Sequence, residues 1–492
     1  MSQDPTARPN SAPPERPRKA LSKMPTGIAG LDDVLHGGLP EARTTLVAGG
    51  PGSGKTVLVL ETLYRAAQAG RPGVFVSFEE TADALHANAL AMGWDLEVLQ
   101  QQQRLALLDP KLDWHAVRAG EFSLRGLLAV LGGHAERLGA RLLVIDAIDV
   151  LMRLFTDEGR RDDELYGLHA WLVEHGFTAV LTAKSRPGGQ LQPAYSFLDF
   201  LADCVLTLDQ RIVEQVSTRR LRVVKYRGSG YVSNECPFVI AHDGLVLMPV
   251  ASAELVQKPY GPMGSSGHAS LDAMLGGGYR RGSSVLIAGP TGCGKTTIAC
   301  TFARGAAERG ERTLYVSFEE AEDRLLSAML SPGLDLAPFV EAGVLEFLTA
   351  MPESMGVEEH LLRLLCAIAR FRPAHVVVDA ISAVNRMGSE AAAFDFLVRL
   401  LSACREQGIT CFYVNQTPRG SAADHITGMG ISSLIDTALV LDYRWEGNQL
   451  ERSLVVLKSR GVCHSNRAHR LTISDSGIGL APLAMSSRQE ET

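Results

Sequence analysis

The sequence is short of cysteine and of long apolar runs. Its first 203 residues contain no cysteine, and the eight cysteines that follow form no CxxC pair. This pattern excludes a disulfide framework and fits a reducing compartment, so we expect a cytoplasmic protein. No apolar run approaches the roughly 18 residues that span a bilayer, and the N-terminus lacks a hydrophobic leader, so we expect no membrane partner.

Positive charge is also in short supply. The 48 lysine and arginine residues are outnumbered by 55 aspartate and glutamate residues, which gives a net charge of −7. Proteins that bind nucleic-acid backbones are normally basic, so we do not expect nucleic acid as a partner. A hydrophobic fraction of 46% over 492 residues suffices for two packed domains of the usual size.

The chain is rich in one thing, an internal repeat of four motifs. The first half reads GGPGSGKT at 49–56, SFEE at 77–80, VIDA at 144–147 and KYRG at 225–228. The second half reads GPTGCGKT at 289–296, SFEE at 317–320, VVDA at 377–380 and KSRG at 458–461. Each half places its first glutamate 24 residues after the loop lysine, and its KxRG lysine 79 residues after the aspartate. Such equal intervals indicate a tandem duplication.

Each half alternates short apolar runs with helical stretches. This alternation predicts an α/β fold, in which a mostly parallel sheet is flanked by helices on both faces and a hairpin extends one edge. Residues 1–20 are rich in proline and charge and predict a disordered arm. We expect the first domain at 21–250, a Gly/Pro/Ser-rich linker at 251–267, the second domain at 268–482 and a polar tail at 483–492.

Both GxxxxGKT motifs follow an apolar run and precede a helical stretch, which is the context of a phosphate-binding loop. Glycines let backbone N–H groups surround phosphates, the lysine reaches the outer phosphates, and the threonine binds Mg²⁺. The alternative is a degenerate loop that binds nothing. The expected nucleotide-binding residues are Gly50, Gly52, Ser53, Gly54, Lys55, Thr56, Thr291, Gly292, Cys293, Gly294, Lys295, Thr296 and Thr297.

Asp146 and Asp379 end apolar runs, so we expect each carboxylate to join Thr56 or Thr296 around Mg²⁺. The alternative is that each aspartate caps the next helix. Cys463, His464 and His469 match no common zinc spacing, so a structural role is favoured for them.

The glutamate pairs, Glu79 with Glu80 and Glu319 with Glu320, follow apolar runs beside the expected phosphate site. Carboxylates placed there orient a water or accept a proton from an attacking hydroxyl. The alternative is that they are first-turn glutamates stabilised by a helix dipole.

Two basic pairs, Lys225 with Arg227 and Lys458 with Arg460, project from one face of a strand, because their residues are two apart. Such side chains reach a terminal phosphate across a subunit boundary. The equally weighted alternative is a solvated strand end.

These motifs, in this order and twice over, resemble the KaiC family of circadian clock ATPases and autokinases. LDDVLHGGL at 31–39 and LDAMLGGGY at 271–279 strengthen the resemblance, which covers about residues 20 to 482. It implies two RecA-like rings in a homohexamer, with ATP and Mg²⁺ held between subunits and contacted by the basic pairs of the neighbour. It further implies ATP hydrolysis in the first ring and phosphoryl transfer to the adjacent subunit in the second. We expect Glu79 and Glu80 to orient water in the first ring, and Glu319, supported by Glu320, to be the general base in the second.

The family resemblance also assigns phosphoryl acceptors. The segments that end at Asp442 and Asp209 align at an offset of 233, which places Ser432 opposite Asp199, Ser433 opposite Phe200 and Thr427 opposite Ala194. At these three positions hydroxyls occur in the second half only, so Ser432 and Ser433 are the expected phosphorylation sites and Thr427 a neighbouring threonine of the motif. The alternative is that these hydroxyls satisfy turns near the glycines of this segment.

The resemblance leaves partners and rival functions open. Only about ten residues follow Pro482, so a KaiA-type activator that binds a long tail is not expected, whereas a KaiB-type partner on the first ring remains an option. One rival function is a RecA-like motor on single-stranded nucleic acid, although we see no cluster of basic and aromatic residues for it. Another is a scaffold that ATP assembles for signalling.

Overall fold

The computed structural model describes residues 21–110, 124–155, 157–185, 197–213, 216–248, 258–387, 389–418, 433–446 and 448–483. The expected arm, nearly all of the tail and much of the linker lie outside these residues, as do Thr427 and Ser432. The chain forms two compact units, here called the first and second domains. One comprises the residues up to Asp209 with Arg220–Leu247, and the other comprises Gln210–Arg219 with the residues from Met248 onward.

The first domain is built on a nine-stranded sheet of order β11-β10-β9-β8-β3-β7-β6-β4-β5. The six strands from β8 to β5 pair in parallel. The strands are β3 (Thr44–Gly49), β4 (Gly73–Ser77), β5 (Leu105–Leu108), β6 (Leu142–Asp146), β7 (Thr178–Lys184), β8 (Cys204–Val213), β9 (Val216–Tyr226), β10 (Cys236–Ala241) and β11 (Gly244–Leu247). A separate pair joins β1 (Lys23–Met24) to β2 (Leu39–Pro40).

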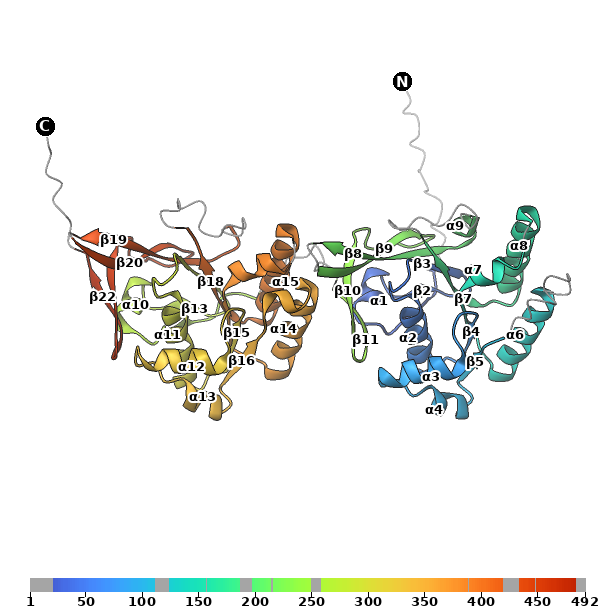
Figure 1. Cartoon of the computed structure of the whole chain (residues 1–492), viewed down its shortest axis with the longest axis horizontal. Helices are drawn as coiled ribbons and strands as arrows, with labels where there is room; N and C mark the ends of the chain where they lie inside the picture. Colours follow the sequence, from blue (N-terminus) through green and yellow to red (C-terminus); the bar gives the residue numbers. More distant parts are fainter. Residues whose placement is uncertain are drawn as a thin grey trace, which may run out of the picture. The chain divides into compact units, whose positions relative to one another are not determined.

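Helices cover both faces of this sheet, because alternate strand residues point to opposite sides. Val47, Phe75 and Val144 pack into the core on the α2 side, whereas their neighbours Leu46 and Val74 pack with α6 and α8 (Figure 1). The helices are α1 (Leu31–Val34), α2 (Lys55–Gln68), α3 (Ala82–Ala91), α4 (Leu96–Gln101), α6 (Leu124–Leu138), α7 (Ile148–Met152), α8 (Glu158–Glu174) and α9 (Phe197–Leu201).

The second domain repeats this arrangement with a nine-stranded sheet of order β16-β15-β17-β18-β14-β19-β20-β21-β22. The strands from β16 to β19 pair in parallel, and β19 to β22 are antiparallel. They are β14 (Ser284–Gly289), β15 (Thr313–Ser317), β16 (Leu345–Thr349), β17 (His375–Asp379), β18 (Thr410–Gln416), β19 (Thr437–Glu446), β20 (Gln449–Ser459), β21 (His469–Ser474) and β22 (Gly477–Pro482). A separate pair joins β12 (Met263–Gly264) to β13 (Tyr279–Arg280).

Helices again lie on both faces of the second sheet, with α11 on one side and α14 and α15 on the other (Figure 1). They are α10 (Ala269–Met274), α11 (Lys295–Glu308), α12 (Glu322–Leu330), α13 (Ala337–Glu341), α14 (Val357–Phe371) and α15 (Glu390–Gln407), with 3₁₀ turns η2 (Pro352–Ser354) and η3 (Ile381–Arg386). The predicted α/β fold is confirmed in both halves. Within the described residues, no helix is both long and apolar enough to cross a membrane.

The second domain buries a polar cluster at the amino end of β17. The Tyr279 hydroxyl contacts His375 Nε2 at 2.8 Å, and Arg309 donates to that hydroxyl at 3.1 Å. Burial lowers the pKa of His375 to about 4. The negative charge of Glu311, whose Oε2 lies 3.8 Å from Nε2, acts in the opposite direction and raises this pKa, but by less. The imidazole is therefore neutral in the folded chain at neutral pH.

This histidine predicts loss of stability in mild acid. An unfolded histidine takes up a proton near pH 6.5, whereas His375 takes one up only near pH 4, so falling pH favours the unfolded chain over that window. The expected loss is about 3 kcal/mol between pH 7 and pH 4. Thermal unfolding is measured at pH 7 and pH 5 for the unsubstituted chain and for His375→Leu, which introduces the leucine that the first domain has at the matching position, Leu142. The melting temperature should fall less between the two pH values in His375→Leu than in the unsubstituted chain. An equal fall in both chains would contradict the prediction.

Candidate active site

A glycine-rich loop joins a buried strand to a helix in each domain. β3 ends at Gly49 and α2 begins at Lys55, and β14 and α11 are placed in the same way around the second loop. Gly54 has a φ of 94° and Gly294 a φ of 101°, a left-handed conformation that other residues rarely adopt. The loop turns sharply there, so the free N–H groups of the helix N-terminus border it, as a phosphate site requires.

The loop lysines are buried and fold over their own loops. Lys55 Nζ donates to the carbonyls of Gly49 at 3.0 Å and Gly50 at 2.9 Å, and Lys295 Nζ donates to Pro290 at 2.8 Å. Burial lowers the pKa of Lys55, which the nearby Asp146 carboxylate opposes. These ammonium groups point to where the outer phosphates of a nucleotide would lie.

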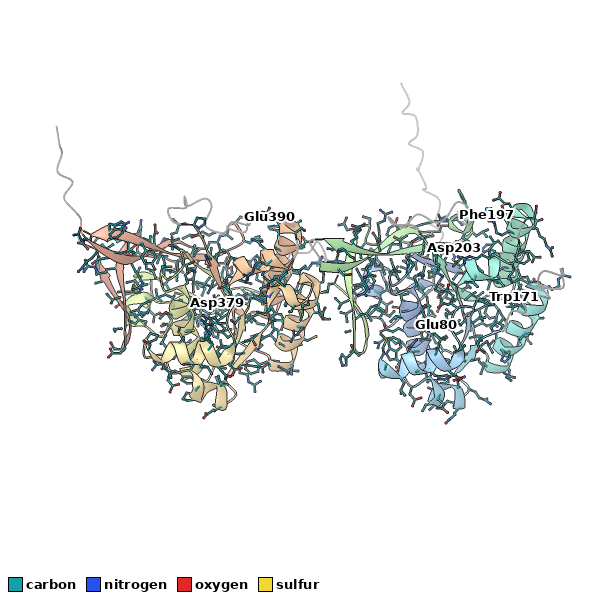
Figure 2. All side chains as sticks on the ribbon, in the orientation of Figure 1. Glu80, Trp171, Phe197, Asp203, Asp379 and Glu390 are labelled. Carbon is teal, nitrogen blue, oxygen red and sulfur yellow. The ribbon has the colours of Figure 1, made fainter. Side chains whose placement is uncertain are left out.

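The two strand-end aspartates sit beside the loop threonines. Thr56 Oγ1 donates to Asp146 Oδ2 at 2.8 Å, and the Thr182 hydroxyl donates to the other carboxylate oxygen. Asp379 receives hydrogen bonds from Thr296 and from the Tyr315 hydroxyl, the latter at 2.8 Å. Burial raises the pKa of both aspartates. Asp379 is labelled in the second domain in Figure 2.

A hydroxyl and a carboxylate held together beside a phosphate loop fit Mg²⁺, which prefers oxygen ligands and keeps some from water and phosphate. The helix that follows Asp146 has Ala147 as its N-cap residue, without a side-chain cap, so the structure does not favour the capping alternative. Among the described residues, no group of three His, Cys, Asp or Glu side chains is placed to hold a metal ion, Cys463, His464 and His469 included.

The glutamate pairs lie at the ends of β4 and β15, ahead of the next helices. α3 begins at Ala82 after the N-cap residue Thr81, so Glu79 and Glu80 are not in its first turn. Glu80 accepts from Asn88 Nδ2 at 2.9 Å, and burial together with Asp146 raises its pKa. Glu79 forms an ion pair with Lys184.

The second glutamate pair borders open space. Glu319 and Glu320 line a hollow of about 680 Å³ together with Arg386 and Glu353, which pair at 3.3 Å. A second hollow of about 370 Å³ also contains Glu319 and Arg386 and extends to Gln416. Both hollows lie at the carboxyl edge of the sheet, where α/β domains usually bind ligands.

The basic pairs lie at the opposite edge of each sheet from the loops. Lys225 Nζ donates to the Asp199 carbonyl at 2.7 Å, and Arg227 Nη1 lies 3.8 Å from Asp203. The Asp203 N–H bonds to Thr44, the first residue of β3, whereas the loop follows the last residue of that strand. Each basic pair is therefore separated from the loop of its own domain by the length of a strand.

The pair in the second domain has matching contacts. Arg460 Nη2 donates to the Ser433 carbonyl at 2.5 Å, as Arg227 Nη2 donates to the Phe200 carbonyl at 3.0 Å. Burial lowers the pKa of Lys458 and of Lys225, and the neighbouring arginine lowers each further. The side chain of Ser433 is exposed, and its partner Ser432 lies outside the described residues.

The sequence predictions missed Thr182, Lys184, Tyr315 and Arg386. Thr182 and Lys184 come from β7, which pairs with β3, so they reach the loop through the sheet and not through sequence proximity. Both residues lie near the end of a buried strand, and that strand is adjacent to the one that precedes the phosphate-binding loop. Only the order of strands in the sheet reveals this adjacency.

One of these missed residues gives a testable prediction. Tyr315→Phe places in the second domain the residue that β4 carries as Phe75, and it removes a donor from the buried Asp379 carboxylate. Loss of that bond should lower the free energy of unfolding by about 1–3 kcal/mol. Urea unfolding of both chains measures it, and unchanged midpoints and slopes would refute the prediction.

Comparison with known proteins agrees with this geometry in both halves. The model of the KaiC ATPase family matches residues 24–252 and 265–484. The chain belongs to the KaiC family. It is 37% identical to the circadian clock protein KaiC2 of Synechocystis sp. over 465 residues, which cover 94% of this chain and 82% of that one. It is also 32% identical to the circadian clock oscillator protein KaiC of Parathermosynechococcus lividus, over 97% of this chain and 90% of the relative.

KaiC membership explains the repeated architecture, because both matched segments contain one loop, one glutamate pair and one strand-end aspartate. As a KaiC-family ATPase, the protein binds ATP. The two copies differ around these shared residues, since Asp146 is bonded to Thr182 and Asp379 to Tyr315.

Proposed function

We propose that the protein is a Mg-ATP-dependent serine autokinase and ATPase with unlike sites in its two domains. The first domain hydrolyses ATP, and the second transfers the terminal phosphate to Ser432 and Ser433 of a neighbouring subunit. The observation that carries this proposal is the placement of Ser433 in contact with Arg460, where the first domain has Phe200 in contact with Arg227.

This pairing supports the alignment of the two halves at the acceptor segment. The matched arginines bond to matched backbone carbonyls, so Ser433 and Phe200 occupy corresponding places in the two domains. The exposed Ser433 is accessible to a second subunit. The basic pairs lie too far from their own loops to touch a nucleotide there, which supports their contacting one held by the adjacent subunit of a homohexamer.

In the second domain, different residues have different roles in phosphoryl transfer. Glu319 accepts the proton of the serine hydroxyl as its oxygen bonds to the γ-phosphorus, the bond from that phosphorus to the bridging oxygen breaks, and ADP leaves. Lys295 and the loop N–H groups bind the phosphates, while Glu320 supports the base. Mg²⁺ held by Thr296 and Asp379 would neutralise the phosphate charge.

In the first domain the same residue types act on water. Glu79 and Glu80 position a water against the γ-phosphorus, and Thr56 with Asp146 would hold Mg²⁺. Phe200 offers no hydroxyl where the second domain has Ser433, so hydrolysis is the reaction available there. The names of the relatives, both circadian clock proteins, support a timing role. We further propose that the protein acts in the cytoplasm and that a KaiB-like partner binds its first ring.

Incubation with ATP labelled at the γ-phosphate and Mg²⁺, followed by phosphopeptide mapping, tests the proposal. Label should appear on the peptide that contains Ser432 and Ser433 and disappear in a chain with alanine at both positions. ATP hydrolysis without label would favour an ATP-driven machine or scaffold and would overturn the autokinase. Stimulation of hydrolysis by single-stranded nucleic acid, sensitive to salt, would favour a motor.

A further inference from the structure

Lys184 lies directly beside the phosphate-binding loop of the first domain. In the parallel pairing of β3 with β7, its Cα stands opposite Gly49, and the next residue donates its N–H to the Gly49 carbonyl at 3.1 Å. The Lys184 backbone N–H is itself held by Asp149 Oδ1 at 3.2 Å. The sheet therefore fixes the base of this side chain at the entrance of the loop.

The ammonium group of Lys184 lies close to charged groups of both signs. It pairs with the Glu79 carboxylate, and both side chains are 31% exposed, so the pair borders solvent and is not packed in the core. The Lys184 charge also contributes to lowering the pKa of Lys55, after burial, which places the two ammonium groups within electrostatic range. The Lys55 and Lys184 ammonium groups and the Glu79 carboxylate therefore lie within electrostatic range of one another beside the loop.

The second domain has a neutral residue at this place. Gln416 stands opposite Gly289 in the pairing of β14 with β18, and the next residue donates to the Gly289 carbonyl at 3.1 Å. Gln416 is exposed and lines the hollow that contains Glu319 and Arg386. The two loops are alike in sequence, but the residue that the neighbouring strand places beside each loop differs. It is the charged Lys184 in the first domain and the neutral Gln416 in the second.

We propose that Lys184 distinguishes ATP from ADP in the first domain, an inference that rests on the proposed binding of ATP there. When ATP binds, the multiply charged terminal phosphate is a stronger partner for the ammonium group than the single carboxylate of Glu79. Lys184 moves to that phosphate, and Glu79 is released to position the attacking water. ADP has no terminal phosphate at that point, so Lys184 stays on Glu79.

The test uses the full chain with Lys295→Ala, so that nucleotide binding reports the first domain. Affinities for a non-hydrolysable ATP analogue and for ADP are measured by competition with a fluorescent nucleotide. Lys184→Gln should weaken binding of the ATP analogue about 10-fold or more, because a charge-assisted contact is lost, and change ADP binding less than about 2-fold. Lys184→Arg should restore the preference, which also shows that the glutamine variant is not merely misfolded.

The reciprocal change provides a second measurement. In a chain with Lys55→Ala, Gln416→Lys should raise the preference of the second domain for the ATP analogue over ADP. Equal weakening of both nucleotides by Lys184→Gln, or no weakening of either, would overturn the inference. Failure of the unsubstituted first domain to bind the ATP analogue would instead overturn the proposed function, and the inference with it.

Discussion

Glu319→Gln is expected to slow phosphoryl transfer to Ser432 and Ser433 by about 10²- to 10⁴-fold, the usual contribution of a general base. The amide has nearly the same shape as the carboxylate but does not accept the proton of the attacking hydroxyl. Because Glu319 lines a hollow at the edge of the sheet and lies outside the core, the variant should fold and bind ATP as before. The initial rate of label incorporation from γ-labelled ATP measures the effect.

Asp323→Asn is the matched control for this variant. It removes one negative charge from the first turn of α12, four residues beyond Glu319, and touches none of the proposed machinery. We expect it to incorporate label at close to the original rate. If Glu319→Gln does so too, the proton acceptor is another group, and Glu320→Gln becomes the next variant to measure.

Glu79→Gln is expected to lower ATP hydrolysis in the first domain by about 10²- to 10⁴-fold for the same reason. The rate of phosphate release is measured in a chain that also has Glu319→Gln, so that turnover in the second domain does not mask the loss. Asp83→Asn, in the first turn of α3, changes the charge equally near the site and should leave the rate nearly unchanged. Hydrolysis at the control rate in Glu79→Gln would show that Lys184 pairs with a glutamate that has no part in the reaction.

The sequence was sufficient to predict the α/β fold and the loops, because these depend on local patterns. A buried strand, a glycine-rich turn and a helix follow one another along the chain. The loop at Gly54 and Lys55 can therefore be predicted without knowledge of the tertiary structure. The strand-end aspartates share this property, since β6 ends at Asp146. Their roles in binding nucleotide and metal remain predictions that the variants above will test.

The sequence was insufficient where distant segments meet. Lys184 reaches Glu79 across 105 positions, and the pairing depends on the order of β3, β7, β6 and β4 in the sheet. The repeat also shifts by one residue at this strand, because Lys184 stands opposite Gly49 as Gln416 stands opposite Gly289, an offset of 232 and not 233. Comparison of the halves at the single offset of 233 therefore pairs Lys184 with Thr417. It does not reveal that the charged lysine of the first domain corresponds to the neutral Gln416 of the second.

The aspartate and glutamate motifs are the same in the two domains, but the residues around them differ. This difference is the physical basis for proposing different reactions in the two domains. The buried Asp146 is bonded to threonine hydroxyls, whereas the buried Asp379 is bonded to a threonine and to Tyr315. Glu79 pairs with a lysine, whereas Glu319 borders a hollow. Both domains therefore share the residues expected to bind ATP. They differ in the contacts of the glutamate beside the phosphate site.

Phosphopeptide mass spectrometry after incubation with Mg-ATP, on the unsubstituted chain beside Glu79→Gln and Glu319→Gln, tests the central claim most directly. We expect phosphate on Ser432 or Ser433 in the unsubstituted chain and in Glu79→Gln, and its loss in Glu319→Gln. An unmodified acceptor peptide in all three chains, or phosphate that persists in Glu319→Gln and disappears in Glu79→Gln, would contradict the division of labour between the domains.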